Sequence, residues 1–342
     1  MTPAAGDDAL SAADEQLDAL VHRADLDELI RLVDARTSAQ DWAGLRRAHD
    51  RARHAVTTGR QLWPVATLAE YRLALLAPPE WAAMTIADDG GLFTIGPLPE
   101  VIAQDHTWAE LAGVLPSGPR AAIVAHERVL RGEALDHGTV GALPPVIDMP
   151  FELAPWEPRY ELAAYTDNGI DAPSPPVPAA GAVQPFERSD AAELISDDSV
   201  DLAVRQLVET WTADSNGHAE VVAVIGTAAD AVAALGVTRG SLVEFSLAEA
   251  MAWLAWAGAS GGAHGRRRGA ALGRFGALWT LAAVLDVTDE WPVPLDELAQ
   301  LAGELRWYWW DAAEPVTGWR LQLTVEDRLD GMAWAIAARD DT

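Results

Sequence analysis

The chain has 342 residues, half of them hydrophobic, and a formal net charge of −28. It contains no cysteine and no lysine, so all 24 of its permanently basic residues are arginine. These absences exclude thiol nucleophiles, disulfides, cysteine-bound zinc or iron–sulfur clusters, lysine Schiff bases and the lysine of a P-loop. The negative charge repels nucleic-acid phosphates and anionic membranes, so we expect neither of them as a partner.

We expect a soluble protein in the cytoplasm. Residues 1–16 carry no basic residue and no apolar run of the kind found in a signal peptide. The longest apolar stretches are broken by charges or glycine within about a dozen residues, whereas a membrane-spanning helix needs about 20. Arginine in place of lysine is typical of GC-rich coding sequences, and adaptation to a salty cytoplasm is the alternative explanation.

The first part of the chain is expected to form antiparallel helices after a loose terminus at residues 1–10. Apolar residues recur at intervals of three and four, at Leu26, Leu29, Ile30 and Val33, and so form one face of a helix. Further helices are predicted over 41–57, which Gly59 ends, and over 65–77, which Pro78 ends. Short polar connections between such helices favour helical hairpins, and no fixed repeat period is present.

The helical character continues to about residue 135. Residues 87–98 are interpreted as a loop or a short hairpin. Thr107 and Glu110 form a capping box, in which each side chain satisfies the other's end of a helix. Pro119 stands at a position that the first turn of a helix accepts, and it is predicted to open a helix that ends near Leu130.

Residues 172–186 are the predicted linker between two domains. This stretch contains prolines at positions 173, 175, 176, 178 and 185, among small residues. The domain prediction is therefore a mainly α-helical domain over residues 1–171 and an α+β domain over residues 187–342.

The second half combines predicted strands and helices. Strands are predicted over 220–226 and 241–245, where β-branched residues gather. Capping boxes at Thr227 and Ser246 open two helices. Two more helices are predicted over 266–285 and 295–309, and an antiparallel hairpin is predicted around the Asp330-Gly331 turn between residues 319 and 340. The predicted fold class is α+β, with an N-terminal helical array and about four C-terminal strands that end in the hairpin.

One segment combines three features that bind anions. Backbone N–H groups of a glycine-rich loop turn toward one point, a helix N-terminus adds partial positive charge, and arginine offers paired donors to phosphate or carboxylate. The predicted ligand-binding residues are Ser260, Gly261, Gly262, His264, Arg266, Arg267, Arg268 and Arg274. A structural role is the alternative, because glycines three or four residues apart let a helix pack closely and consecutive arginines point around it. The segment matches neither GxGxxG nor the Walker pattern.

Two further segments carry weaker signals. The polar loop from Trp211 to His218 is typical of a site between a helix and a strand, or of a helix cap formed by Asn-Gly. His218 and His264 would form an acid–base pair if their loops converge. The aromatic run at 306–310, on the predicted helix, either lines a groove or interface or packs in the core against the final hairpin.

No metal site and no cofactor are predicted. His126-Glu127 lacks the second histidine of the HExxH zinc pattern, and the other histidines are scattered. A GxSxG nucleophile elbow is also absent. Catalysis would therefore depend on carboxylate, histidine or serine side chains.

Four segments resemble an uncharacterised protein family of high-GC, actinobacteria-like genomes. They are LPEVIAQDHTWAEL, AHERVLRGE, ASGGAHGRRRGA and ELRWYWWDAAEPVTGW. The resemblance covers most of the chain. It implies no activity and assigns no functional residue.

Three hypotheses about function follow. The first is binding of a small anionic metabolite that contains phosphate or carboxylate, at the 260–274 segment. The second is a protein–protein interaction module that uses the helical array and exposed tryptophans. The third is a hydrolase or transferase, which requires a pocket with a histidine beside a carboxylate.

Overall fold

A computed structural model describes residues 5–87, 94–135, 137–141, 143, 144, 146–177, 182–187, 192–314 and 317–341. The chain divides into two compact units that alternate along the sequence. Unit 1 comprises Met1–Arg128, His137–Pro144 and Ala164–Asp171. Unit 2 comprises Val129–Asp136, Pro145–Ala163 and Ala172–Thr342. No helix among the described residues is long and apolar enough to cross a membrane.

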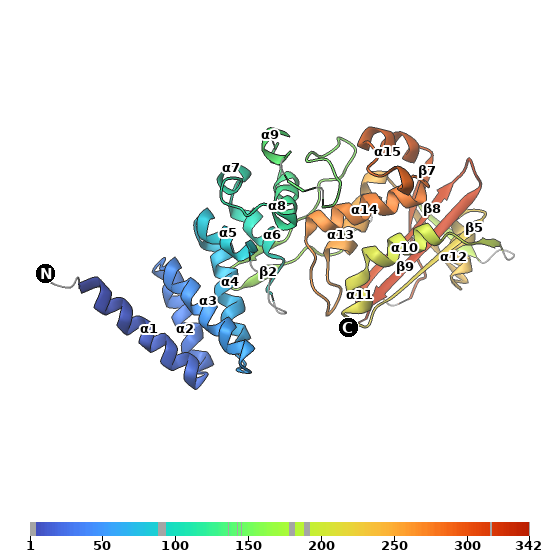
Figure 1. The fold of residues 1–342 in the computed structure, drawn as a ribbon. Helices are drawn as coiled ribbons and strands as arrows, with labels where there is room; N and C mark the ends of the chain where they lie inside the picture. Colours follow the sequence, from blue (N-terminus) through green and yellow to red (C-terminus); the bar gives the residue numbers. More distant parts are fainter. Residues whose placement is uncertain are drawn as a thin grey trace. The chain divides into compact units, whose positions relative to one another are not determined.

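Unit 1 is built from helices that follow one another along the chain (Figure 1). They are α1 (Ala5–Arg23), α2 (Leu26–Ser38), α3 (Trp42–Thr57), α4 (Trp63–Leu76), α5 (Pro79–Ala87), α6 (Leu98–Asp105), α7 (Trp108–Leu111), α8 (Pro119–Leu130) and α9 (His137–Val140). The predicted array is confirmed. The expected loose terminus at residues 1–10 is wrong from Ala5 onward, where α1 begins, and residues 1–4 lie outside the description. So does half of the predicted 87–98 loop, at residues 88–93.

Apolar faces and side-chain caps explain the first helices of unit 1. The side chains of Asp25 and Asp41 accept hydrogen bonds from the backbone at the starts of α2 and α3. Leu29, Val33 and Leu45 are fully buried in the core that these helices share with α4. Removing these side chains from water is what holds the array together.

Unit 1 also contains a short strand pair that the sequence did not predict. Strands β1 (Ala164–Thr166) and β2 (Gly169–Asp171) are antiparallel. The Tyr71 hydroxyl donates to the carbonyl oxygen of Thr166 at 2.6 Å and lies 3.1 Å from that of Gly169. The Gln104 side chain binds both backbone groups of Tyr165, as a neighbouring strand would. These side chains supply the partners that so short a hairpin lacks.

Unit 2 is dominated by a seven-stranded sheet with the order β3-β6-β7-β8-β9-β5-β4. Its strands are β3 (Val183–Glu187), β4 (Glu193–Ile195), β5 (His218–Ile225), β6 (Arg239–Phe245), β7 (Leu305–Asp311), β8 (Trp319–Asp327) and β9 (Met332–Asp340). Every neighbouring pair is antiparallel. The predicted strands near 220 and 241 and the closing hairpin are confirmed, and the α+β class with them.

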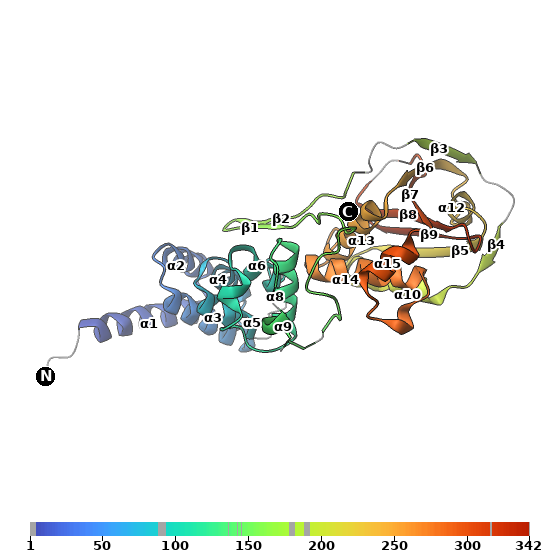
Figure 2. The same ribbon diagram turned by 90° about the horizontal axis from the view of Figure 1, so that it is seen from above.

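The helices of unit 2 interrupt the strands. They are α10 (Asp198–Leu207), α11 (Glu209–Ala213), α12 (Ala228–Ala234), α13 (Leu247–Ala259), α14 (Ala270–Val284), the 3-10 turn η1 (Thr288–Glu290) and α15 (Leu295–Ala302). The capping boxes at Thr227 and Ser246 are both present. Figure 2 shows the strands side by side, with α12 apart from the group formed by α10, α14 and α15.

Three predicted boundaries are wrong. Residues 183–187 form edge strand β3 instead of linker, and Pro185 is tolerated because an edge strand has unpaired positions. Pro178 of the linker lies outside the described residues. The helix predicted from 266 begins at Ala270, after Gly269 with φ of +99°. The helix predicted to 309 ends at Ala302, because the aromatic run pairs as β7 between β6 and β8.

The two faces of the sheet have different covers. Successive residues of a strand point to opposite faces. On one face, α12 packs on Val224, Ala333 and Ala335. On the other face, the Trp334 indole donates to Asp197 at the start of α10, and Trp319 stacks on Trp256 of α13. Helix α12 is short, so the face beneath it is only partly covered.

Candidate functional site

The predicted ligand segment meets the Trp211–His218 loop at one buried carboxylate. Asp340 is fully buried at the end of β9. Its two oxygens accept from the Ala263 amide at 2.6 Å and from the Ser215 hydroxyl at 2.8 Å. The Trp211 indole donates to the Ser260 hydroxyl at 3.0 Å. The two polar loops therefore converge, and their polar groups bind each other.

The glycines of this segment have structural roles. A Cβ atom on Gly261 would clash with the backbone of Gly265, and one on Gly265 would clash with the backbone of Thr210. Gly262 has φ of +66°, and a Cβ there would meet Asp340. Close approach of backbone to backbone accounts for these glycines without a ligand.

The arginines of the segment point to different places. Arg274 is fully buried, where it forms a two-pronged ion pair with Glu157 at 2.7 and 2.8 Å and donates to two backbone carbonyls. It fastens residues 150–157 to α14. Arg268 donates to the Gln206 carbonyl at 2.8 Å, while His264 and Arg266 are exposed. These predicted ligand residues do not share one site with Arg274.

Arg267 lines a separate small cavity of about 120 Å³. Tyr160, Trp256 and Pro173 form part of its wall. The Trp256 indole donates to the Pro173 carbonyl at 3.1 Å, so the start of the proline-rich segment packs here. The cavity is smaller than a typical metabolite pocket, which has a volume of at least about 300 Å³.

The aromatic run is a core element. Trp307, Tyr308 and Trp310 are each less than 5% exposed on β7. The Trp310 indole nitrogen lies 3.1 Å from the Leu323 carbonyl and 3.2 Å from that of Ile336, so its ring reaches over β8 toward β9. These three residues accordingly offer no exposed aromatic surface for a protein partner.

The larger hollow of unit 2 is a groove of about 610 Å³ on the sheet face that α12 covers in part. Its floor comes from β5, β7, β8 and β9. Its walls come from residues 235–239 after α12 and residues 312–314 after β7. The volume lies within the range of about 300 to 1,000 Å³ found for small-molecule sites.

Three basic side chains form one row across the floor of this groove. Arg339 of β9 is paired in register with Arg320 of β8 on one side and with His218 of β5 on the other. All three residues line the groove. Directly paired residues have Cβ atoms about 5 Å apart, so a single anionic group can be reached from several of them.

A second row lies two residues further along the strands. Ala337 of β9 is paired with Gln322 of β8 and with Glu220 of β5, and all three line the groove. Gln322 is 9% exposed, which places it low in the floor. The small side chain of Ala337 leaves room between the two longer polar ones. The next row passes beneath α12, where Ala335 belongs to the hydrophobic core.

The groove is a basic area of an acidic protein. Its lining contains three arginines, the two in the row and Arg239, against the two carboxylates Glu220 and Glu314. Asp341 lies beside the row, but its carboxylate is 4.0 Å from the Arg339 guanidinium, and both side chains are more than half exposed. So distant and exposed an ion pair is weak.

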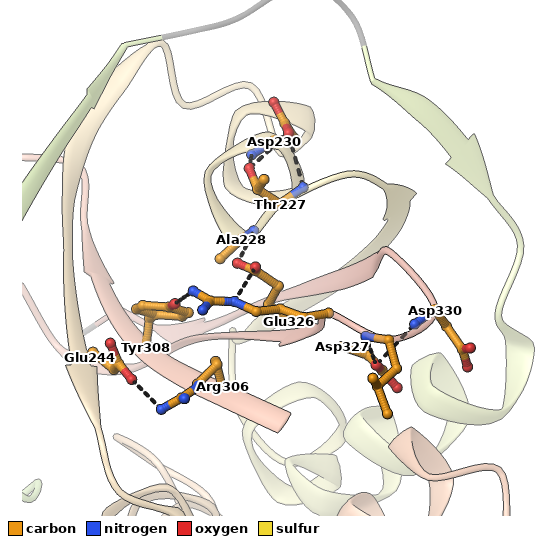
Figure 3. A network of polar contacts seen from close by, with 11 residues as sticks. Thr227, Ala228, Asp230, Glu244, Arg306, Tyr308, Glu326, Asp327 and Asp330 are labelled. Carbon is orange, nitrogen blue, oxygen red and sulfur yellow. Dashed lines mark hydrogen bonds and ion pairs between the residues drawn. The ribbon is translucent and has the colours of Figure 1, made fainter. Parts of the chain in front are cut away.

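The opposite end of the same sheet face carries arginines that bind carboxylates (Figure 3). Arg306 binds Glu244 at 3.1 Å, and Arg328 binds Glu326 at 2.9 Å. Glu326 also accepts from the Ala228 amide at the start of α12. Burial and the nearby Glu326 raise the pKa of Tyr308. This end is a closed network in which arginines face carboxylates.

The proposed histidine pair does not assemble on one face. His218 shares its sheet face with Arg339, whereas the next residue, Asp340, points to the opposite face and holds Ala263 beside His264. No cluster of three or more histidine and carboxylate side chains suited to a metal ion is found among the described residues.

Comparisons with known proteins place the chain in a family. It belongs to a family of unknown function, DUF6183, whose match covers residues 27–342. The expected membership of an uncharacterised family is thereby confirmed. No curated protein and no solved structure matches the chain significantly.

Proposed function

We propose that the protein binds a small anionic molecule, with a phosphate or carboxylate group, in the groove of unit 2. The observation that carries this proposal is the row of His218, Arg339 and Arg320 on three adjacent strands. Like charges on directly paired residues destabilise a sheet. A row of this kind is explained if an anion normally lies across it.

The chemistry of the row suits such an anion. Arginine presents a planar set of donors that match the oxygens of phosphate or carboxylate. The strands that carry these residues are central members of the sheet, so the donors have rigid supports. The Gln322 amide adds an uncharged polar group beside the anion.

The test is titration calorimetry at low ionic strength with inorganic phosphate and pyrophosphate. A charge-assisted hydrogen bond contributes about 1.5 to 3 kcal/mol, so removing both paired arginines is expected to weaken binding by well over 10-fold. The variant is the double substitution Arg320→Gln, Arg339→Gln. Absence of binding to the wild type, or an unchanged affinity in the variant, would contradict the proposal.

Two control variants separate the groove from other arginines. Arg306→Gln removes one charge from the same sheet face at its far end, and it should leave the affinity unchanged. Arg266→Gln removes an exposed arginine of the predicted 260–274 segment. If Arg266→Gln abolishes binding while the groove variant retains it, the anion site lies in that segment instead.

A second function is favoured by one observation. His218 and Glu220 lie two residues apart on β5 and line the groove together. A histidine beside a carboxylate is the arrangement that a hydrolase or transferase without metal requires. Turnover of p-nitrophenyl phosphate that His218→Gln abolishes would support this function, whereas binding without turnover supports a binding protein.

A further inference from the structure

We infer that the ligand of the groove carries a hydrogen-bond donor, an amine or a hydroxyl, about 7 Å from its anionic group. The inference rests on the proposed anion-binding function and defines the class of ligand. It follows from the second row of the floor, Glu220, Ala337 and Gln322, which lies two residues along the strands from the basic row. Two residues of an antiparallel strand span about 6.8 Å.

The side chains of the second row can bind a hydrogen-bond donor and would repel a second anion. The Glu220 carboxylate accepts hydrogen bonds, and the Gln322 amide both donates and accepts. A ligand with a second phosphate or carboxylate at this distance would face the Glu220 carboxylate and be repelled. An amine can donate to both side chains, and a hydroxyl can donate to Glu220 while it accepts from the Gln322 amide, because the Ala337 methyl leaves the space between them open.

The third row limits the length of this part of the ligand. Ala335 lies between Val222 and Thr324 in the register, and helix α12 packs on this row. The Thr324 hydroxyl donates to the Trp334 carbonyl at 2.8 Å, which occupies it within the sheet. Polar groups for a ligand therefore end at the second row. An anion and one donor group, two rows in all, fit the floor.

The chemical class is thus an amino- or hydroxyl-bearing phosphate or carboxylate of metabolite size. Amino alkyl phosphates, sugar phosphates and acids whose amine or hydroxyl lies several carbons from the carboxylate share this chemistry. Molecules with a single anionic group and an apolar remainder lack the donor. Molecules with anions at both ends place a charge against Glu220.

The experiment compares by calorimetry three probes that share a propyl phosphate chain: propyl phosphate, 3-hydroxypropyl phosphate and 3-aminopropyl phosphate. The wild type is expected to bind the hydroxyl and amine compounds about 10-fold more tightly than propyl phosphate, the effect of one good hydrogen bond to a charged partner. Gln322→Leu and Glu220→Gln should reduce this ratio, the latter mainly for the amine. Neither variant should weaken propyl phosphate.

Each outcome decides a different point. Equal affinity of the wild type for all three probes overturns the donor inference and leaves the anion-binding function intact. Binding of none of them overturns the proposed function and the inference with it. Glu244→Gln is the matched control for Glu220→Gln, since it changes a carboxylate on the same face outside the groove, and it should preserve the preference.

Discussion

Arg320 and Arg339 lie directly opposite each other in the antiparallel register of β8 and β9, and both line the groove. Two guanidinium groups on paired residues repel each other across about 5 Å. The chain as a whole has a net charge of −28, so this repulsion between positive groups is a local feature. The pair is therefore a local source of repulsion that an anion bound across it would reduce.

Replacing one member of this pair is expected to stabilise the ligand-free protein. Arg339→Thr removes the repulsion and adds a residue with good strand propensity. Because the Arg339 side chain is 62% exposed, screening limits the gain to a few tenths of a kcal/mol. Urea denaturation at low salt measures it, and 0.5 M sodium chloride should reduce it. A loss of stability at low salt would show that the pair is not repulsive.

The turn that joins the two strands of this pair was predicted from the sequence, but the register of the pair was not. The Asp330-Gly331 turn was predicted, and the observed pairing of Asp327 with Met332 fixes Arg320 opposite Arg339. The turn is local: Asp327 accepts from the Leu329 amide at 2.8 Å, and Gly331 has φ of +67°. A two-residue Asp330-Gly331 turn would have paired Leu329 with Met332, two residues away from the observed register, so the turn alone would not have found the basic pair.

The other residues of the groove could not be predicted from the sequence. His218 joins the row because β5 pairs with β9, which lies more than one hundred residues later in the chain. No local pattern specifies a pairing between such distant strands. The run at 306–310 failed for another reason: aromatic and apolar residues follow one another without a clear period of two or of 3.6, so β7 resembled a helix until its neighbours in the sheet were known.

Arg274 is expected to be essential for stability. Arg274→Met leaves the Glu157 carboxylate buried with only the Tyr160 hydroxyl and the Ala154 amide as partners. Breaking a buried ion pair by removing one member costs about 3 to 5 kcal/mol. Chemical denaturation measures the loss. The double variant Arg274→Met, Glu157→Leu should recover part of it, and a single variant of wild-type stability would contradict a structural role.

Alkaline pH is expected to destabilise the protein through Tyr160. Burial, with the charge of Glu157 second, raises the pKa of Tyr160 well above its usual value. The unfolded chain releases this proton near pH 10, while the folded chain keeps it to higher pH. The free energy of unfolding is thus unaffected below pH 10 and falls as the pH rises above it. Urea denaturation between pH 9 and 11 should show a shallower decline for Tyr160→Phe than for the wild type.

Mild acid is expected to destabilise the protein through His49 in unit 1. Burial lowers the pKa of His49, and this effect outweighs the hydrogen bond with Asp50 that would raise it. Below pH 6.5 the unfolded chain takes up a proton that the folded chain resists. Stability from this group is therefore present above pH 6.5 and is lost as the pH falls through the lowered pKa. Urea denaturation from pH 7.5 to 5.5 should give a smaller slope for His49→Gln, and an equal slope would exclude this histidine as the cause.

The glycine-rich loop offers a direct test of whether its glycines serve the fold. Gly265→Ala places a methyl group against the backbone of Gly261 and Thr210, neither of which can move without disturbing the contacts of Asp340. Overpacking of this kind costs about 1 to 3 kcal/mol. Gly118→Ala is the matched control, because its φ is not positive and its added methyl meets nothing within 4 Å. Thermal unfolding should show a fall of several degrees for Gly265→Ala and almost none for Gly118→Ala. If Gly265→Ala keeps the wild-type midpoint, the glycines are not needed for the packing of this loop. Ligand binding by residues 260–274 would then be the better explanation for their presence.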